Sequence, residues 1–192
     1  MSPDQFFLKY STPLLALVIL VSATALLDLY NPKNDLIKRL GEKYPGETVY
    51  FSTDQKPFYS PTALFGMLDK YSDEDRRAHI RFIYLDLIYP LIYSVTAAIL
   101  LAFLLPVLLP ARQAKFPYLS LLPIAAAVFD YLENLSMLWI LRRYAGGYRP
   151  SGVAFFSSAM TTLKVLLFCA ILLLFVASLG AFVVRALRTA GH

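Results

Sequence analysis

Residues 118–141 read YLSLLPIAAAVFDYLENLSMLWIL. A helix needs about 20 mostly apolar residues to cross the hydrocarbon core of a membrane, and this stretch is long enough. Asp130, Glu133 and Asn134 interrupt the apolar run, and residues at these spacings share one face of a helix. The stretch therefore predicts a membrane-spanning helix with one polar face, which must be turned away from lipid.

The composition of the chain is typical of a membrane protein. Of its 192 residues, 58% are hydrophobic and only 16% are charged, whereas about 25% are charged in an ordinary soluble domain. The formal net charge is +5. The Lys and Arg residues lie beside the apolar runs, where they suit lipid headgroups and membrane topology better than nucleic acid. We therefore predict no nucleic-acid partner.

Motifs that would indicate a known cofactor or catalytic centre are missing from the sequence. The single cysteine, Cys169, lies in an apolar run, allows no intrachain disulfide and is expected to pack as a small apolar side chain. No residue spacing matches a metal site, and the chain has no P-loop, glycine-rich dinucleotide fingerprint, zinc-protease motif or catalytic triad pattern. We predict no metal and no cofactor, and whether the protein is an enzyme stays open.

Four apolar runs are long enough to span a membrane. A polar loop at 31–79 separates the first run from the second. We predict a single all-α transmembrane domain over 1–192, built as a four-helix bundle. The expected spans lie near 12–30, 80–109, 118–141 and 153–185.

Two features of the topology stay open. The first run could instead be a secretory signal peptide with a cleavage site at Ala23-Thr24-Ala25, although Asp4 is unusual in the basic region that begins such a peptide. The distribution of Lys and Arg favours a cytoplasmic long loop, but the acidic residues of this loop are also compatible with its translocation. The orientation and the identity of the membrane are therefore not predicted.

The long loop contains one amphipathic stretch, TALFGMLDKY at 62–71. Helical spacing places five of its side chains on one face, namely Ala63, Leu64, Met67, Leu68 and Tyr71. The pattern predicts a short helix that lies at the membrane interface or covers the end of the bundle.

The start of the second span carries a capping signal. Ser72 and Asp75 are spaced as a helix cap, so this helix should begin in water at Asp73 before it enters the bilayer. Pro90 should then kink it. His79 lies near the mouth of the span and is expected to be a surface residue, the alternative being a general acid or base at the entrance to a site.

Each predicted span carries polar side chains in apolar surroundings. On the second span Asp86 shares a stripe with Tyr89 and Tyr93, and on the fourth Lys164 shares one with Thr161. Because successive spans run in alternate directions, these groups and the acidic face of the third span fall in the same half of the membrane. We therefore predict one shared ligand-binding site formed by Asp86, Tyr89, Tyr93, Asp130, Glu133, Asn134, Thr161 and Lys164.

Energetics restrict where these charges can point. An isolated charge at the bilayer centre costs on the order of 3 kcal/mol or more, so the charged members of this set must face inward. Three acids against Lys164 leave an excess of negative charge, which requires a protonated carboxyl or a second cation. This favours a proton-handling site or a pocket for a cationic or hydroxylated ligand.

Plainer interpretations of the same residues stay open. The buried charges could serve only to fix the packing of the helices, and the tyrosine hydroxyls could simply satisfy Asp86. Asp28, near the end of the first span, is expected to be an ordinary interfacial residue.

Three segments resemble a known family. LDKYSDEDRRAHI at 68–80 leads into the second span, FDYLEN at 129–134 lies in the third, and LLDLYNP at 26–32 ends the first. These segments are similar to the corresponding parts of the EXPERA domain of emopamil-binding protein and the sigma-2 receptor. The chain also resembles uncharacterised bacterial four-span proteins that share its D-x-x-Y-P-x-x-Y, acid-x-x-E-N and T-x-x-K patterns.

The resemblance to the EXPERA family implies a cavity in one leaflet for amphiphiles such as sterols. Asp86 and Glu133 would be the acids that hold an amine or move a proton. The isomerases of that family use a histidine within the membrane, whereas His79 lies at its edge, and Lys164 stands where their pockets hold neutral or aromatic groups. The resemblance therefore implies binding of an amphiphile more strongly than sterol isomerisation.

The functional interpretations can be ranked. An integral membrane protein that binds a lipid-like or sterol-like amphiphile comes first, and a structural or assembly protein whose charges only fix helix packing comes second. An intramembrane isomerase or lipid-modifying enzyme with a carboxyl acid or base is third. A carrier is least favoured, because the other half of the spans is apolar, as in AAILLAFLL at 97–105. The expected partner is a membrane lipid or small amphiphile, and the oligomeric state stays open.

Overall fold

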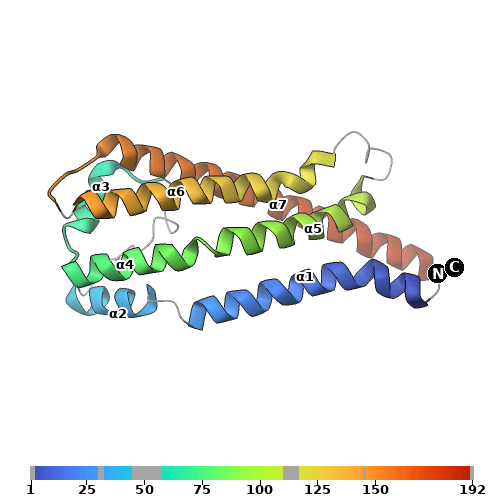
Figure 1. The fold of residues 1–192 in the computed structure, drawn as a ribbon. Helices are drawn as coiled ribbons and strands as arrows, with labels where there is room; N and C mark the ends of the chain where they lie inside the picture. The colour runs from blue at the N-terminus through green and yellow to red at the C-terminus, as the bar shows by residue number, and fades with distance from the viewer. Residues whose placement is uncertain (1–2, 30–32, 45–57, 110–116, 145, 191–192) are drawn as a thin grey trace.

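The computed structural model describes residues 3–29, 33–44, 58–109, 117–144 and 146–190. Within these ranges the secondary structure is helical throughout and contains no strand (Figure 1). The helices are, in chain order, α1 (Pro3–Leu29), α2 (Lys33–Lys43), α3 (Pro61–Leu68), α4 (Asp73–Asp86), α5 (Tyr89–Leu108), the short 3-10 helix η2 (Pro117–Leu121), α6 (Leu122–Tyr144) and α7 (Ser151–Ala190).

The described part of the chain contains four helical stretches that are long and apolar enough to cross a membrane. The prediction of an all-α protein with four spans is therefore confirmed at this level. α1 packs against α5, which in turn packs against α6 and α7, and the two chain ends lie at the same end of the molecule (Figure 1). The candidate spans are Thr12–Leu29, Asp73–Leu108, Tyr118–Tyr144 and Ser151–Arg185.

The second span begins at the predicted cap. The Ser72 hydroxyl accepts a hydrogen bond from the Asp75 backbone N–H at 3.2 Å, and the Asp75 carboxylate accepts one from the Ser72 backbone N–H at 3.0 Å. This reciprocal capping box satisfies backbone donors that the first turn of α4 would otherwise leave unpaired. The prediction that the helix begins at Asp73, well before the apolar part of the span, is confirmed.

We expect Ser72→Ala to lower the free energy of unfolding by about 1 kcal/mol, because alanine cannot accept the Asp75 N–H. The measurement is chemical unfolding in detergent micelles followed by circular dichroism. Ser22→Ala, on an exposed part of α1, is the control and should leave the unfolding curve unchanged. Equal curves for Ser72→Ala and the unchanged protein would contradict the assigned cap.

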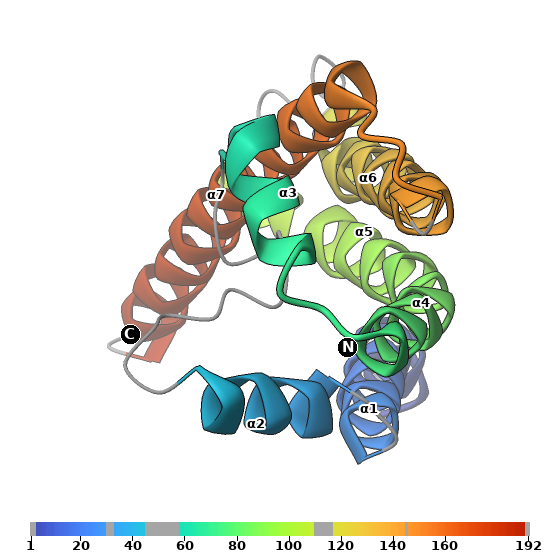
Figure 2. The ribbon, with the colours of Figure 1, turned by 90° about the vertical axis from the view of Figure 1, so that its left-hand side faces the viewer.

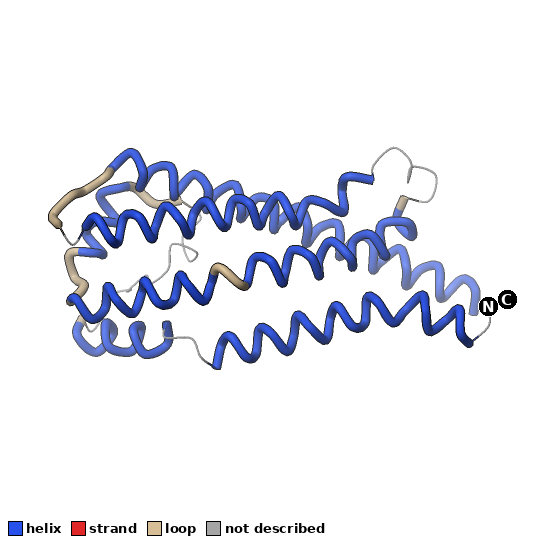
Figure 3. Tube along the Cα trace, viewed as in Figure 1, coloured by secondary structure: helices blue, strands red, loops and turns tan. Residues whose placement is uncertain are grey.

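The second span is broken into two helices near its middle. α4 ends at Asp86 and α5 begins at Tyr89, so that Leu87 and Ile88 form a short turn, drawn in tan between α4 and α5 in Figure 3. Pro90 follows at once. It has no N–H to bond the carbonyl of Asp86 four residues earlier, and its ring crowds that carbonyl. The predicted kink is confirmed, and it places Asp86 at the end of a helix.

Besides the start of α4, the described residues of the loop predicted at 31–79 contain two helices, of which one was expected. α3 forms where the amphipathic stretch predicts a helix, and Ser60 caps it by accepting the Ala63 N–H at 3.1 Å. Its buried face differs slightly from the prediction, because Phe65 is buried and Ala63 is exposed. α2 was not predicted. Residues 45–57 of the same loop lie outside the described residues.

Two apolar clusters lie at different levels along the long helices. The first joins α2, α3, α4, α6 and the start of α7, at the end of the molecule where α3 lies across α7 (Figure 2). The second joins α5, α6 and α7 further along, through Leu101, Leu105, Ala126 and Ile171. On α5, α6 and α7 the polar residues predicted to form a site fall between these two clusters.

Candidate functional site

A buried ion cluster joins α6 to α7. The Lys164 Nζ atom lies 3.2 Å from Asp130 Oδ1 and donates a hydrogen bond to it. The same Nζ lies 2.8 Å from Glu133 Oε2, a charge contact that lacks hydrogen-bond alignment. All three residues are at most 5% exposed. The prediction that these charged side chains turn inward and meet is confirmed.

α5 contributes a phenol to the cluster. The Tyr93 hydroxyl donates a hydrogen bond of 3.0 Å to Asp130 Oδ2. The expectation that the tyrosine hydroxyls could satisfy Asp86 is not met for Tyr93, whose hydroxyl reaches the carboxylate of α6 instead. The Tyr93 ring packs against Phe168 of α7 and against Tyr89, with centroids 5.3 and 5.4 Å apart. Tyr93 therefore fixes the position of Asp130 from the side of α5.

Asn134 extends the cluster to α4. Its side-chain amide donates to Asp86 Oδ2 at 2.9 Å and lies 3.4 Å from Asp130 Oδ1. The i, i+4 spacing on α6 brings the carboxylate of Asp130 beside this amide. Asp86 is only partly buried, whereas Asn134 is 7% exposed. Side chains from α4, α5, α6 and α7 thus form one continuous polar network.

Thr161, another predicted site residue, uses its hydroxyl outside the network. It is fully buried on α7, one turn before Lys164, and its Oγ1 donates to the Ser157 carbonyl at 3.1 Å. Such a bond to the preceding turn is the usual way for a threonine hydroxyl to be satisfied inside an apolar helix. Thr161 therefore packs beside the ions without a described hydrogen bond to them.

The network contains more acid than base. Among the described residues the network holds three carboxyls and one ammonium: Asp130 and Glu133 contact Lys164, and Asp86 is joined to them through Asn134. Charges that are removed from water without compensation cost several kcal/mol each, even after relaxation. The arrangement is therefore suited to hold a proton or a second cation beside the partly exposed member, Asp86.

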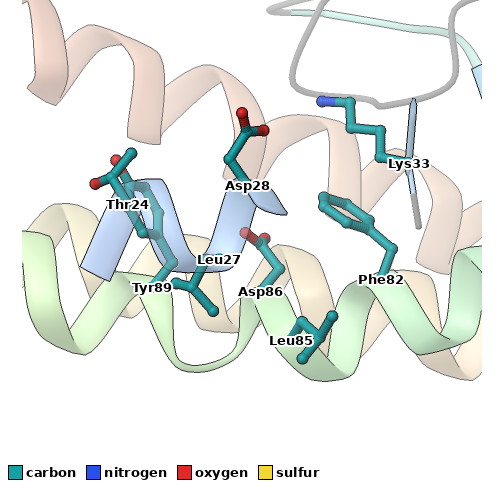
Figure 4. A pocket seen from close by; sticks show the side chains of 8 residues that line it. All are labelled: Thr24, Leu27, Asp28, Lys33, Phe82, Leu85, Asp86 and Tyr89. Atoms are coloured by element: carbon teal, nitrogen blue, oxygen red, sulfur yellow. The ribbon is translucent and has the colours of Figure 1, made fainter. Parts of the chain in front are cut away.

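A pocket of about 180 Å³ opens between the end of α1 and the break between α4 and α5. Figure 4 shows the side chains of Asp28, Lys33 and Asp86 arranged around this hollow, together with the rings of Phe82 and Tyr89. Thr24, Leu27 and Leu85 complete the lining. Asp86 therefore belongs both to the pocket and, through Asn134, to the buried ion network.

The eight predicted site residues are divided between the pocket and the neighbouring region of the buried ion network. Asp86 and Tyr89 line this pocket, and the other six do not. The other six residues that line the pocket were not part of the predicted site, and two of them, Phe82 and Lys33, show why. Phe82 lies one turn before Asp86, so the helical stripe of Asp86 could have revealed it. Lys33 belongs to the unpredicted helix α2, and nothing in the sequence links it to Asp86.

Asp28 contributes to the pocket, which the sequence did not predict. It is exposed near the end of α1, as an interfacial residue should be, but its carboxyl also lines the pocket opposite Asp86. Thr24, one turn earlier, lines the same wall. The first span thus supplies one side of the pocket, and α4 with the start of α5 supplies the other.

His79 is not a surface residue, and that expectation is wrong. It is 3% exposed, and the ring of Tyr71, from the loop after α3, lies against it with the centroids 5.9 Å apart. Its Nδ1 lies 3.4 Å from the Tyr71 hydroxyl, and its ring packs on Phe82. Burial, and then the negative charge of Asp75, raise the pKa of the Tyr71 phenol. The phenol therefore keeps its proton and can donate it to Nδ1, behind the Phe82 wall of the pocket.

A second interaction missed by the sequence fastens the segment before α3 to α7. The Tyr59 backbone N–H donates to the Ser158 hydroxyl, and the Tyr59 hydroxyl donates to the Ser157 hydroxyl, both at 2.9 Å. The two serines are fully buried. No pattern in the sequence pairs residues nearly a hundred positions apart, so this attachment is visible only in the structure.

The described residues contain no group of His, Cys, Asp and Glu that could hold a metal ion. Cys169 is exposed on α7. Comparison of the chain with protein-family models, with curated proteins and with solved structures found no match in any of the three. The function must therefore be argued from the pocket and the ion network themselves.

Proposed function

We propose that the protein is a multi-pass integral membrane protein that binds a lipid-like or sterol-like amphiphile with a cationic headgroup. Its four spans form a bundle, and α3 lies at the membrane interface across one end. The headgroup binds in the pocket between Asp28 and Asp86. The observation that carries this proposal is the presence of two carboxyls and two aromatic rings around one small hollow beside a buried, acid-rich network.

The charge of the pocket favours a cation. Asp28 and Asp86 face Lys33 there, and the adjoining network adds two acids against Lys164. A bound cation would reduce this excess of negative charge. The Lys33 ammonium already lies 5.5 Å from the centre of the Phe82 ring. The face of Tyr89 can attract a ligand ammonium in the same way, an interaction of about 0.5–2 kcal/mol that is strongest away from water.

The size of the pocket favours a headgroup rather than a whole ligand. The volume of the pocket is about 180 Å³. Pockets that enclose a drug-sized molecule measure about 300–1,000 Å³. The pocket can therefore hold an amine with a few attached atoms, and an apolar tail must lie outside it.

The surface of α1 offers a place for that tail. Only 6% of the α1 span is buried within the molecule. Near the pocket, Leu26 and Leu29 are 58% and 77% exposed. A tail leaving the pocket along these side chains would stay in hydrocarbon, which is the environment that a lipid-like ligand requires.

The main competing function is structural. The contacts of Lys164 with both Asp130 and Glu133 favour it, because they join α6 and α7 without involving the pocket. In that case the network would only fix helix packing. The two functions differ in what Asp86 does, since Asp86 meets the network only through Asn134 and also faces the pocket.

The test compares oleylamine with oleyl alcohol as added ligands. We expect oleylamine to raise the thermal unfolding midpoint of the purified protein in micelles, and oleyl alcohol at the same mole fraction to raise it much less. In Asp86→Asn the affinity for oleylamine should fall about tenfold or more, because a hydrogen bond to a charged group is lost. Asparagine preserves the shape of the side chain and can still accept the Asn134 amide.

Asp73→Asn is the matched control, since Asp73 also lies on α4 but its side chain is 81% exposed and far from the pocket. It should bind oleylamine as the unchanged protein does. Equal effects of amine and alcohol, or equal binding by Asp86→Asn and Asp73→Asn, would contradict the proposed function and favour the structural one.

A further inference from the structure

A second pocket lies between α2 and α4, outside the site described above. The two helices pack against each other at the end of the molecule that carries α3 (Figures 1 and 2). The hollow between them measures about 280 Å³. Its lining is almost entirely charged and consists of Asp35, Arg39, Glu74, Arg77, Ala78 and Arg81.

One of the three arginines is already neutralised. The Arg39 guanidinium lies 3.0 Å from the Glu74 carboxylate and 3.6 Å from that of Asp75. Asp75 in turn accepts the hydrogen bonds of the helix cap from Ser72. Arg39 therefore joins α2 to α4, and little of its charge is left for another partner.

The other two arginines that line the pocket remain available to bind an anion. Arg77 and Arg81 are exposed and stand at i, i+4 on α4, and in the part of the chain that the structure describes neither forms a hydrogen bond or an ion pair. Two like charges at this spacing repel each other. Of the lining acids only Asp35 is left to face them, so the pocket keeps about one positive charge that an anion between the two side chains would neutralise.

The position of these arginines along α4 indicates the kind of anion. The helix is charged from Asp73 to Arg77, and Arg81 is its last basic residue before the apolar residues Phe82 and Ile83. In the proposed membrane protein Arg81 marks the boundary between water and hydrocarbon, where lipid phosphates lie. Arginine also matches phosphate oxygens with two parallel N–H donors, which lysine cannot do.

We propose that Arg77 and Arg81 bind one phosphate ester group that carries a single negative charge. This chemistry is shared by the phosphodiester of a membrane phospholipid and by a soluble phosphate compound. The site rests on the membrane location but not on the amine pocket, because no residue lines both hollows. The phosphate site can therefore exist even if no amine binds in the other pocket.

The test is native mass spectrometry of the full chain released from phosphate-free maltoside micelles. The probes are dioleoylphosphatidylglycerol, dioleoylglycerol, which has the same tails without the phosphate, and inorganic phosphate. We expect the phospholipid to bind with one saturable stoichiometry and dioleoylglycerol not to bind. In Arg77→Gln with Arg81→Gln the affinity should fall about tenfold or more.

Arg143→Gln is the matched control. Arg143 is exposed at the same end of the molecule but lies over the Trp139 ring, outside this pocket. It should keep the affinity of the unchanged protein, and size-exclusion profiles of both variants check that they fold. The lysine variant, Arg77→Lys with Arg81→Lys, should recover only part of the affinity.

Each outcome decides the proposal. Loss of phospholipid binding only in the double Gln variant supports a lipid source for the phosphate. Saturable binding of inorganic phosphate that displaces the phospholipid, and that the same variant loses, supports the site with a soluble source. Equal binding of phospholipid and dioleoylglycerol, or equal affinities of the double Gln variant and Arg143→Gln, would overturn it.

Discussion

Lys164→Met should lower the free energy of unfolding by about 3–5 kcal/mol, because removing one partner of a buried ion pair leaves the other charge without compensation. Methionine has nearly the length of lysine, so the variant removes the charge and leaves little empty space. Asp130 and Glu133, each at most 5% exposed, then face each other without the ammonium between them. The measurement is equilibrium unfolding in mixed micelles.

The neighbour Leu163 supplies the control. Its side chain points outward and is 39% exposed, so Leu163→Met should change the free energy of unfolding little. A second variant tests the cause. Adding Glu133→Gln to Lys164→Met removes one of the uncompensated acids and should restore part of the lost stability. If Lys164→Met unfolds as the unchanged protein does, the ammonium does not hold α6 to α7 in the membrane.

The same variant separates the two proposed roles. Lys164 does not line the amine pocket, and its contact with the pocket passes through Asp130 and Asn134 to Asp86. Under the binding proposal, stability falls in Lys164→Met, but the protein that remains folded still distinguishes oleylamine from oleyl alcohol. Under the structural proposal, neither the unchanged protein nor Lys164→Met distinguishes oleylamine from oleyl alcohol.

Local patterns in the sequence predicted the structural features that are determined by residues close together in the chain. The capping box of Ser72 and Asp75 lies within one turn, and the break before Pro90 follows from the chemistry of one residue. The meeting of Asp130 with Lys164 was also predictable, although the two residues are distant in sequence. A charge inside a span must face inward, and matching depth on neighbouring helices leaves few possible partners.

Other features depend on packing between distant segments that no local pattern encodes. α2 is short and mostly polar, and it is stabilised in part by burying Leu36 and Leu40 against residues of other helices. The burial of His79 depends on the loop after α3, and its local surroundings in the sequence, DEDRRAH, are those of a surface. The pocket was predicted only in part because Lys33 reaches it from α2.

The second large effect concerns the packing of α6. Leu141 is fully buried in the cluster that joins α2, α3, α4 and α6, and Leu135 on the same helix is 53% exposed. We expect Leu141→Ala to lower the free energy of unfolding by about 2–5 kcal/mol, because the surrounding side chains cannot fully close the cavity. Leu135→Ala should change it by no more than about 0.5 kcal/mol.

The contrast between the two leucines follows from what surrounds each of them. If Leu135 faces lipid, as the proposed membrane protein requires, the shortened side chain is simply covered by another hydrocarbon chain. At Leu141 the shortened side chain would leave a gap inside a cluster of protein side chains, part of which lies on α2 and α3, outside the candidate spans. Unfolding of both variants in micelles measures the difference. Comparable destabilisation at the two positions would mean that Leu135 is also covered by protein, as it would be in an oligomer joined through this face of α6.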